Sequence, residues 1–360
     1  MIEIISYAGD DMTTLYAVIM AGGRGERFWP LSTNILPKPF IPLLGSDSLL
    51  QNTVSRIQPL VPYEQIMISI GAEHYEAARE QLPRIPRENF LVEPFGRDTS
   101  ACLGFCALHL EQRDKDALML ALPADHYVAD EVEYLKTIRM GLYNLEGSNG
   151  VVFGITPTRP ETGYGYILAE KPKDGGRAWP VISFIEKPEI DTAVRYLAAG
   201  NYYWNSGMFL WKNHTLLELF EKFMPDTCAA LNRLRPLIGD ETAGEEIRNI
   251  FSMLPRISID FGIMEKTDNL RLIPADFGWD DIGSWAALGR ALTPDAHGNI
   301  IQGQASVLES ENCVIYSQSD KIAAFGVSDL IIVQAGGKIL VTTRDKAADL
   351  KKLVTAMKES

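Results

Sequence analysis

Residues 15–45 read LYAVIMAGGRGERFWPLSTNILPKPFIPLLG and join a short apolar run to a glycine-rich loop. The run at 15–20 has the length and composition of a buried strand. Gly22, Gly23 and Gly25 let the backbone approach a ligand closely and turn its N–H groups toward an anion. The stretch therefore predicts a strand that leads into a phosphate-binding loop.

Two familiar phosphate motifs do not fit this loop. A Walker A loop requires Gly-Lys-Ser/Thr where this chain has Gly25-Glu26-Arg27, and the dinucleotide fingerprint requires Gly or Ala where Phe28 stands. The loop instead supplies Arg27, and Lys38 follows between two prolines. Two cations beside a glycine loop suit a triphosphate, because Arg binds phosphate oxygens bidentately. The alternative is a surface turn with solvated charges.

Similar apolar runs recur at 65–70, 117–122 and 150–155, separated by amphipathic stretches. This alternation predicts an α/β fold with a mixed, mostly parallel sheet covered by helices. Ligands of such sheets bind beyond the carboxyl ends of the strands.

From residue 293 the pattern changes to short alternating segments at 305–308, 312–316 and 330–334, followed by a helical pattern at 345–357. We therefore predict a large domain at 1–292 and a small β domain at 293–360 that ends in a helix. Residues 1–13 are expected to form a flexible extension.

Composition limits the classes of partner. The chain has 34 basic and 47 acidic residues, a net charge of −13, so a nucleic-acid backbone would be repelled over most of the surface. No apolar run reaches the ~18 residues of a membrane span, and the first residues lack the pattern of a signal peptide. The four cysteines form no CxxC pair, which favours a cytoplasmic protein without disulfides or a zinc site.

The string AGGRGERFWPLS followed by PKPF closely resembles the signature of sugar-nucleotide pyrophosphorylases. Its Phe-Trp-Pro-Leu-Ser form is similar to the mannose-1-phosphate guanylyltransferase branch. Further motifs continue the resemblance along the chain: EPFGRDTSA from Glu93, LPADH from Leu122, TGYGYI from Thr162, FIEKP from Phe184, YYWNSGMF from Tyr202, SIDFGIMEK from Ser258 and FGWDDIGSW from Phe277.

The resemblance implies a Rossmann-like nucleotidyltransferase domain and a tail that resembles a left-handed β-helix. It also implies transfer of a guanylyl group from GTP to α-D-mannose 1-phosphate, which gives GDP-mannose and pyrophosphate. Longer relatives carry a fused sugar-isomerase domain for which this chain has no room, so we expect one enzymatic activity.

Two carboxylates are candidates for binding Mg²⁺, which prefers one or two carboxylates together with substrate phosphates. Asp125 ends a buried apolar run, where an Asp can also cap the next helix. Asp280 and Asp281 precede a glycine and can also shape a turn. The family's Trp-x-Asp-x-Gly pattern points to Asp281 as the second ligand.

The expected mechanism is in-line attack on the α-phosphate. Arg27 and Lys38 neutralise the departing pyrophosphate, and the resemblance assigns Lys187 to steering the nucleophile. A phosphate oxygen of the sugar 1-phosphate is the nucleophile, and no general base is needed because the second phosphate pKa is about 6. We therefore interpret His126 as a packed or hydrogen-bonding residue.

The resemblance also assigns the sugar-phosphate residues, namely Gly165, Glu186, Lys187, Asn205 and Gly207. The nucleotide-binding candidates are Ala21, Gly22, Gly23, Gly25, Arg27, Gly71, Glu93, Pro94, Asp98 and Thr99. Asp98 and Ser100 depart from the family's Arg-Asn-Thr-Ala pattern. An ionised Asp98 can only accept hydrogen bonds, so the base contacts stay open.

Two alternatives for the function remain at this point. The same reaction could use another sugar 1-phosphate or nucleotide, or the chain could be a catalytically silent nucleotide-sugar sensor. Retention of the five proposed catalytic residues argues against a sensor. The β tail could form a homodimer, or it could cover an exposed sheet edge.

Overall fold

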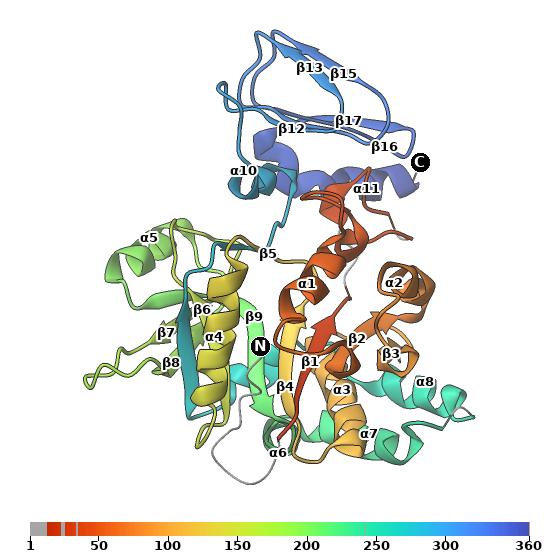
Figure 1. Ribbon diagram of the computed structural model, residues 1–360, viewed down its shortest axis with the longest axis vertical. Helices are drawn as coiled ribbons and strands as arrows, with labels where there is room; N and C mark the ends of the chain where they lie inside the picture. The colour runs from red at the N-terminus through yellow and green to blue at the C-terminus, as the bar shows by residue number, and fades with distance from the viewer. Residues whose placement is uncertain (1–12, 23–25, 34, 241, 360) are drawn as a thin grey trace.

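The computed structural model describes residues 13–22, 26–33, 35–240 and 242–359 (Figure 1). The predicted extension at 1–13 therefore lies outside the described residues except for Thr13. Gly23 and Gly25 of the predicted phosphate loop also lie outside them.

A nine-stranded sheet forms the centre of the larger part of the molecule. Its order is β3 (Phe90–Glu93), β2 (Ile66–Gly71), β1 (Leu15–Met20), β4 (Leu118–Pro123), β9 (Tyr202–Lys212), β6 (Gly150–Ile155), β10 (Leu270–Ala275), β8 (Trp179–Ile185) and β7 (Tyr166–Ala169). The pairings from β3 to β4 and between β6 and β10 are parallel, whereas β7, β8 and β9 pair antiparallel with their neighbours. The sheet is mixed, as predicted, with a larger antiparallel part than the alternation of strands and helices suggests.

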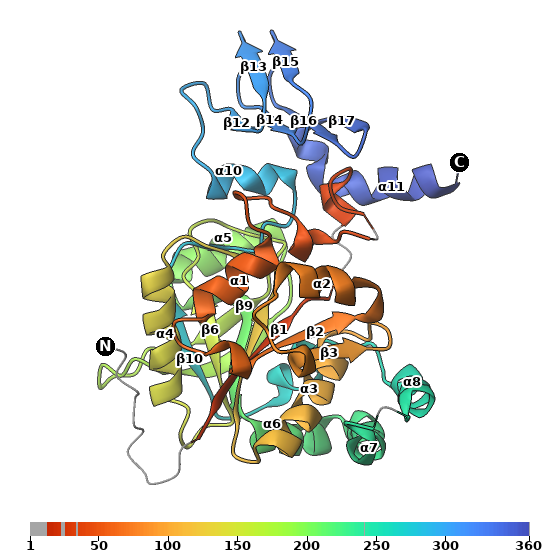
Figure 2. The same ribbon diagram turned by 45° about the vertical axis from the view of Figure 1, so that its right-hand side comes forward.

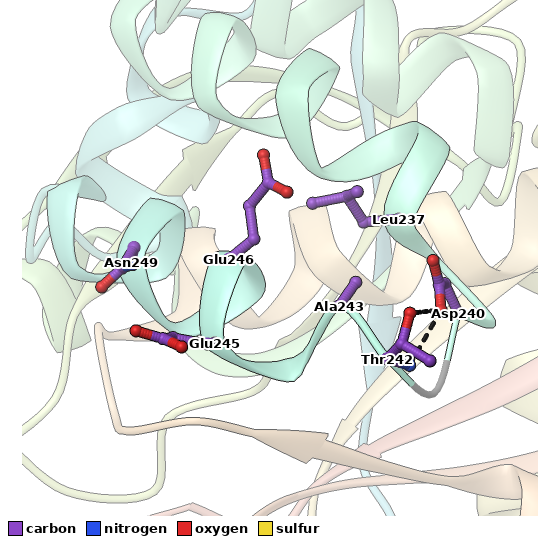
Figure 3. Close-up of a pocket in the computed structure, with 7 residues that line it drawn as sticks. All are labelled: Leu237, Asp240, Thr242, Ala243, Glu245, Glu246 and Asn249. Carbon is purple, nitrogen blue, oxygen red and sulfur yellow. Dashed lines mark hydrogen bonds between the residues drawn. The ribbon is translucent and has the colours of Figure 1, made fainter.

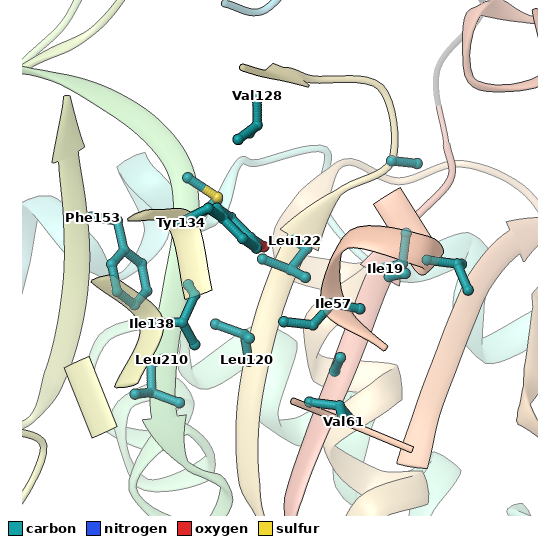
Figure 4. Packing of buried hydrophobic residues seen from close by; sticks show 14 of the residues in the cluster. Ile19, Ile57, Val61, Leu120, Leu122, Val128, Tyr134, Ile138, Phe153 and Leu210 are labelled. Atoms are coloured by element: carbon teal, nitrogen blue, oxygen red, sulfur yellow. The ribbon is translucent and has the colours of Figure 1, made fainter. Parts of the chain in front are cut away.

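Helices cover both faces of this sheet (Figure 1). One face carries α1 (Leu49–Ile57), α2 (Tyr75–Gln81), α4 (Glu131–Tyr143) and α5 (Ile190–Ala199), and the other carries α3 (Thr99–Arg113), α6 (Asn213–Phe223), α7 (Pro225–Leu234) and α8 (Gly244–Met253). Successive residues of β1 point into opposite cores, with Ala17 and Ile19 on one side and Val18 on the other. Figure 4 shows the packing of the first core around Leu120, Ile138 and Phe153. Burial on both faces explains why the strand runs are continuously apolar.

Local sequence fixes where the helices that flank the site begin. Ser48 accepts a hydrogen bond from the backbone of Gln51, and the Gln51 side chain accepts one from the Ser48 N–H, so α1 begins with a capping box. Asp98 caps α3 by accepting from the Thr99 N–H. Both helix N-termini therefore have defined positions beside the carboxyl ends of the strands.

The C-terminal part is a small β domain stacked on one end of the molecule (Figure 2). Parallel rungs are formed by β12 (Ile300–Gln302), β14 (Val314–Ser317) and β16 (Leu330–Ala335), with β17 (Lys338–Thr343) antiparallel at the edge. A second sheet pairs β13 (Ala305–Leu308) with β15 (Ile322–Phe325). This arrangement confirms the β-helix-like domain, while the division at residue 292 stays a prediction.

The last helical segment differs from its prediction at 345–357. It starts as the 3₁₀ helix η9 (Arg344–Asp349) and becomes α-helical only in α11 (Leu350–Glu359). No helix of the described residues is long and apolar enough to cross a membrane.

Candidate active site

A two-stranded sheet places the two predicted metal ligands side by side. Asp125 follows the carboxyl end of β4 and precedes β5 (Tyr127–Val128). β5 pairs antiparallel with β11 (Trp279–Asp280), and Asp281 comes directly after β11. The structure thus joins two segments more than 150 residues apart in the sequence.

Lys38 connects these two segments. It opens the 3₁₀ helix η2 (Lys38–Phe40), and its Nζ lies 2.9 Å from Asp125 Oδ2 and donates to the Asp281 carbonyl oxygen at 2.5 Å. Burial alone would raise the pKa of Asp125, but the charge and the hydrogen bond of Lys38 outweigh it and the pKa is lowered. Asp125 is therefore an ionised carboxylate at neutral pH.

Asp281 and Asp280 have different surroundings. The Asp281 carboxylate accepts a hydrogen bond from the Tyr164 hydroxyl at 2.8 Å. Asp280 is buried and is bound bidentately by Arg290 at 2.5 and 2.9 Å, and it also accepts from the Ile282 N–H. Both oxygens of Asp280 are engaged by Arg290, which supports Asp281 as the carboxylate that faces a ligand.

Tyr164 stays protonated in this arrangement. Burial raises the pKa of its hydroxyl, and the negative charges of Asp281 and Asp280 raise it further. The neutral Tyr164 hydroxyl keeps its proton and donates a hydrogen bond to Oδ1 of the Asp281 carboxylate.

Arg27 lies beside the Asp281 loop. It belongs to the 3₁₀ helix η1 (Glu26–Phe28) and is exposed. A Cβ placed on Gly283 would lie 3.5 Å from Arg27 Nη1 and 3.1 Å from the Asp281 carboxylate, so glycine permits this approach. Gly22 is also exposed at the start of the loop, next to the buried Ala21, whose N–H donates to the Ser69 carbonyl.

His126 is neutral and hydrogen-bonded. Trp279 Nε1 donates to its Nδ1 at 3.1 Å, and the two rings pack edge to face. Burial lowers the pKa of His126 although the charge of Asp125 opposes this effect. A ring that accepts at Nδ1 carries its proton on Nε2, which lies 4.0 Å from Asp125 Oδ1.

The predicted sugar-phosphate residues lie near one another, next to the carboxyl end of β4 that leads to Asp125. The Asn205 N–H donates to the Gly165 carbonyl at 2.9 Å, and a Cβ on Gly165 would lie 3.8 Å from Glu186 Oε2. Lys187 pairs with Glu186 at 3.2 Å and is mostly exposed. Gly207, with φ of 67°, approaches Pro123 at the end of β4 and so brings this group toward Asp125.

Asp260 belongs to the same group, although it is not among the predicted site residues. It lies in the short helix α9 (Ile259–Gly262) and accepts from Asn205 Nδ2 at 2.6 Å. The Gly207 N–H donates to Asn205 Oδ1 at 3.0 Å, so the orientation of the Asn205 amide is fixed from both ends. Burial raises the pKa of Asp260, and the charges of Glu186 and Asp98 add to this. The motif SIDFGIMEK was its only signal in the sequence.

The predicted base-binding residues follow the ends of β2 and β3. Glu93 is buried and accepts from Ser69 Oγ at 2.8 Å, and burial raises its pKa. Gly71 ends β2, and the exposed Glu73 carboxylate lies 2.8 Å from where a Cβ on Gly71 would be. Pro94 is half-buried directly after β3.

The side chains of Asp98 and Thr99 accept hydrogen bonds from backbone N–H groups of the protein itself. Asp98 caps α3 with a positive φ of 73°, and Thr99 Oγ1 accepts from the Ile259 N–H at 2.8 Å. The charge of Asp98 also reaches Asp260. The structure therefore places these two residues between the predicted base side and the sugar side.

A separate surface hollow is unsuited to phosphates. It lies between η6 (Arg235–Leu237) and α8 (Figure 3), and its lining includes Asp240, Glu245 and Glu246. The Asp240 carboxylate accepts hydrogen bonds from the Thr242 N–H at 2.8 Å and from the Thr242 hydroxyl at 2.7 Å. Three acidic side chains would repel a triphosphate.

The oxygen donors at Asp125 and Asp281 suit a hard divalent cation. The described residues contain no group of three or more His, Cys, Asp and Glu that could enclose a metal by themselves. A cation here would be completed by substrate phosphates, the manner of binding that Mg²⁺ prefers.

Two family models match the chain. The nucleotidyl transferase model covers residues 16–297, and the mannose-phosphate isomerase/GMP-like β-helix model covers residues 303–357. The chain is 36% identical over 352 residues to a mannose-1-phosphate guanylyltransferase of Escherichia coli K12, spanning 96% of this chain and 73% of that protein. The chain belongs to the mannose-1-phosphate guanylyltransferase family of nucleotidyl transferases.

Other members of the family give the same result. A mannose-1-phosphate guanylyltransferase of Salmonella montevideo is 38% identical over 95% of this chain and 73% of its own length. The xanthan biosynthesis protein XanB of Xanthomonas campestris (strain B100) is 37% identical over 97% of this chain and 74% of its own length.

A solved structure of a family member has the same fold. A Thermus thermophilus protein described as a mannose-1-phosphate geranyltransferase superposes with a TM-score of 0.88 at 36% identity, covering 96% of this chain and 100% of that chain. The predicted fold class is thereby confirmed.

All four cysteines are free, and Cys102, Cys106 and Cys313 are buried as small apolar residues.

Proposed function

We propose that this protein transfers a guanylyl group from GTP to α-D-mannose 1-phosphate, producing GDP-mannose and pyrophosphate. The observation that supports this most strongly is the contact of Lys38 with both Asp125 and Asp281. Gly207, which binds Asn205 through its N–H, lies against Pro123, two residues before Asp125. Two of the named relatives, from Escherichia coli K12 and Salmonella montevideo, are mannose-1-phosphate guanylyltransferases.

The reaction forms one bond and breaks one. A phosphate oxygen of mannose 1-phosphate attacks the α-phosphorus of GTP, and the bond from that phosphorus to the β-phosphate oxygen breaks in line with the attack. Pyrophosphate leaves with the electron pair of this bond. No proton has to be removed, because the sugar phosphate is largely dianionic above its second pKa of about 6.

The residues contribute by positioning and by charge. Arg27 and Lys38 neutralise the pyrophosphate as its charge develops, and Lys187 directs the anionic nucleophile. Glu186, Asn205 and the backbone at Gly165 and Gly207 offer hydrogen-bond partners to sugar hydroxyls. The glycine loop and the ends of β2 and β3 carry the proposed nucleotide contacts.

We propose Mg²⁺ as the divalent cation that the family's reaction uses. Asp125 and Asp281 would hold it, and when bound it would reduce the repulsion between the anionic nucleophile and the triphosphate. Tyr164, by donating to Asp281, orients that carboxylate.

Two further proposals concern assembly and location. Leu308 and Phe325 are neighbours on β13 and β15 and are 63% and 65% exposed, which supports a homodimer formed through the C-terminal β domain. Sedimentation equilibrium would measure the mass in solution, and a monomer at micromolar concentration would contradict the dimer. Four free cysteines are in keeping with a cytoplasmic location.

The function is tested by pyrophosphate release from purified protein with Mg²⁺. GTP, ATP, UTP and dTTP are each combined with mannose, glucose and other sugar 1-phosphates. Release confined to GTP with mannose 1-phosphate would support the proposal. Release with a different pair would overturn the substrate assignment. If the protein bound nucleotide but released nothing with any pair, it would be a nucleotide-sugar sensor.

A further inference from the structure

A third hydrophobic core joins the phosphate loop to the C-terminal β domain. Phe28 and Leu31 come from the loop, Ile282 and Trp285 follow the metal-side Asp281, and the remaining members include Tyr316 of β14. All five side chains are less than 9% exposed. The Phe-Trp-Pro-Leu part of the signature therefore packs against the C-terminal domain, and Figure 2 shows this loop directly below that domain.

Trp285 lies at the centre of this core. Its ring is fully buried and makes an edge contact with Phe28 at 5.3 Å between centroids, and it contacts Tyr316 at the same distance. Its Nε1 donates to the Trp29 carbonyl at 3.1 Å. One side chain thus contacts the phosphate loop through both a ring and a hydrogen bond, and the β domain through a second ring.

Both neighbouring segments carry groups assigned to the reaction. Phe28 directly follows Arg27, and Ile282 directly follows Asp281. Ile282 is fully buried with φ of 44°, a conformation that costs a non-glycine residue free energy and persists only where packing enforces it. The third core therefore fixes the backbone next to both Arg27 and Asp281, because Phe28 and Ile282 are packed in it.

A second tether runs from the same segment to Asp280. Arg290 of α10 (Leu288–Ala291) lies just before the C-terminal strands and binds Asp280 bidentately. The linker into the β domain is thereby attached to the residue before Asp281.

We propose that Trp285 is a positioning residue through which the C-terminal β domain holds Arg27 and Asp281 in their catalytic arrangement. This inference rests on the proposed function for the roles of those two residues. Its consequence is that side chains of the β domain that touch no substrate influence turnover and GTP binding. Mannose 1-phosphate binding should change little, because Gly165, Glu186 and Asn205 do not belong to this core.

The test compares two disruptive variants with two controls. Trp285→Phe keeps an aromatic ring but loses the donor to Trp29, and Tyr316→Leu removes the ring on the β-domain side. Tyr316→Phe preserves that ring and serves as the conservative rescue. Phe220→Leu changes an equally buried residue of α6, at the opposite end of the molecule in Figure 1, and controls for general loss of stability.

We expect Trp285→Phe and Tyr316→Leu to lower kcat about tenfold, comparable to a small displacement of charged groups in the site. KM for mannose 1-phosphate should stay within about twofold, and Tyr316→Phe should match the unaltered protein. The affinity for GTP, measured by titration calorimetry without sugar phosphate, should fall in the two impaired variants and not in Phe220→Leu.

Unchanged kcat and GTP affinity in Trp285→Phe and Tyr316→Leu would overturn the inference. So would losses no larger than those of Phe220→Leu at equal thermal stability. Failure of the proposed function would show separately as inactivity of the unaltered protein. In that case the GTP affinities of the same variants still decide the role of Trp285.

Discussion

Lys38 has two partners that a surface lysine would not have. It is 10% exposed, pairs with Asp125 and donates to the Asp281 carbonyl. Lys38→Met should lower kcat at least about 100-fold, because the lost charge acts on the developing pyrophosphate. The fold should persist, as judged by circular dichroism and the unfolding midpoint. Lys222→Met, at an exposed position of α6, is the control, and near-normal turnover of Lys38→Met would remove Lys38 from catalysis.

The adjacent carboxylates Asp280 and Asp281 should respond differently to amide substitution. Asp281→Asn should abolish most activity and raise the Mg²⁺ concentration needed for half-maximal rate, with little change in stability. Asp280→Asn should lower the free energy of unfolding by about 2 kcal/mol, because it weakens the buried contact with Arg290. Urea unfolding and Mg²⁺ titration of activity measure the two effects. If Asp280→Asn instead changed the Mg²⁺ requirement and Asp281→Asn did not, the ligand assignment would be reversed.

Asp260 holds the Asn205 amide toward the proposed sugar site. Asp260→Ala should raise KM for mannose 1-phosphate about tenfold, because the amide loses one of the two bonds that fix its orientation. Asp260→Asn keeps an acceptor and should be close to normal. KM for GTP should be unchanged in both variants. An equal rise in KM for both substrates would point to general disruption rather than sugar recognition.

At the scale of elements, α3 carries a half-buried histidine, His109, that makes stability depend on pH. Burial, together with the charge of Arg113, lowers the pKa of His109 to about 4 from its ordinary 6.5. Its Nε2 has no hydrogen-bond partner among the described residues. Between these pKa values the unfolded chain binds a proton at His109 that the folded chain does not. The contribution of His109 to the free energy of unfolding is therefore complete above pH 6.5 and is lost as the pH falls toward 4.

The expected contribution of His109 between pH 7 and pH 5 is about 2 kcal/mol. His109→Leu should remove this part of the pH dependence, because leucine does not titrate. Urea unfolding of both proteins at the two pH values gives the comparison. Parallel pH dependence in the two proteins would show that other groups carry the loss.

The elements best predicted from the sequence are those buried on both faces. The strands expected at 15–20 and 150–155 match β1 and β6 in the structure. Continuous apolar runs make such strands visible. β8 is only partly buried, and residues of intermediate and full exposure alternate along its first half. It pairs antiparallel with β10 on one side and with β7 on the other. Local sequence does not encode that pairing.

At the scale of the whole molecule, sequence motifs indicated the site residues, and only the fold showed their partners. Asp125 and Asp281 could be proposed from strand ends and family patterns. The contact between Lys38 and Asp281 joins residues 243 apart, and the hold of Asp260 on Asn205 joins residues 55 apart. Periodicity cannot show such contacts, because they arise only when distant loops meet at one edge of the sheet.

The third core could not be predicted from the sequence for the same reason. Phe28 and Leu31 read as part of a family signature, but their partners Trp285 and Tyr316 lie more than 250 residues further along the chain. The sequence therefore indicated a small separate β domain and did not show that this domain packs against the phosphate loop.

The most direct measurement follows the fate of the sugar phosphate itself. Mannose 1-phosphate labelled with oxygen-18 on its phosphorus is incubated with GTP, Mg²⁺ and the protein, and the products are separated and examined by ³¹P NMR and mass spectrometry. Attack by the sugar phosphate on the α-phosphorus predicts that all of the label appears in GDP-mannose and that pyrophosphate is unlabelled and formed in equal amount. Label in pyrophosphate, or release of pyrophosphate without GDP-mannose, would contradict the proposed reaction.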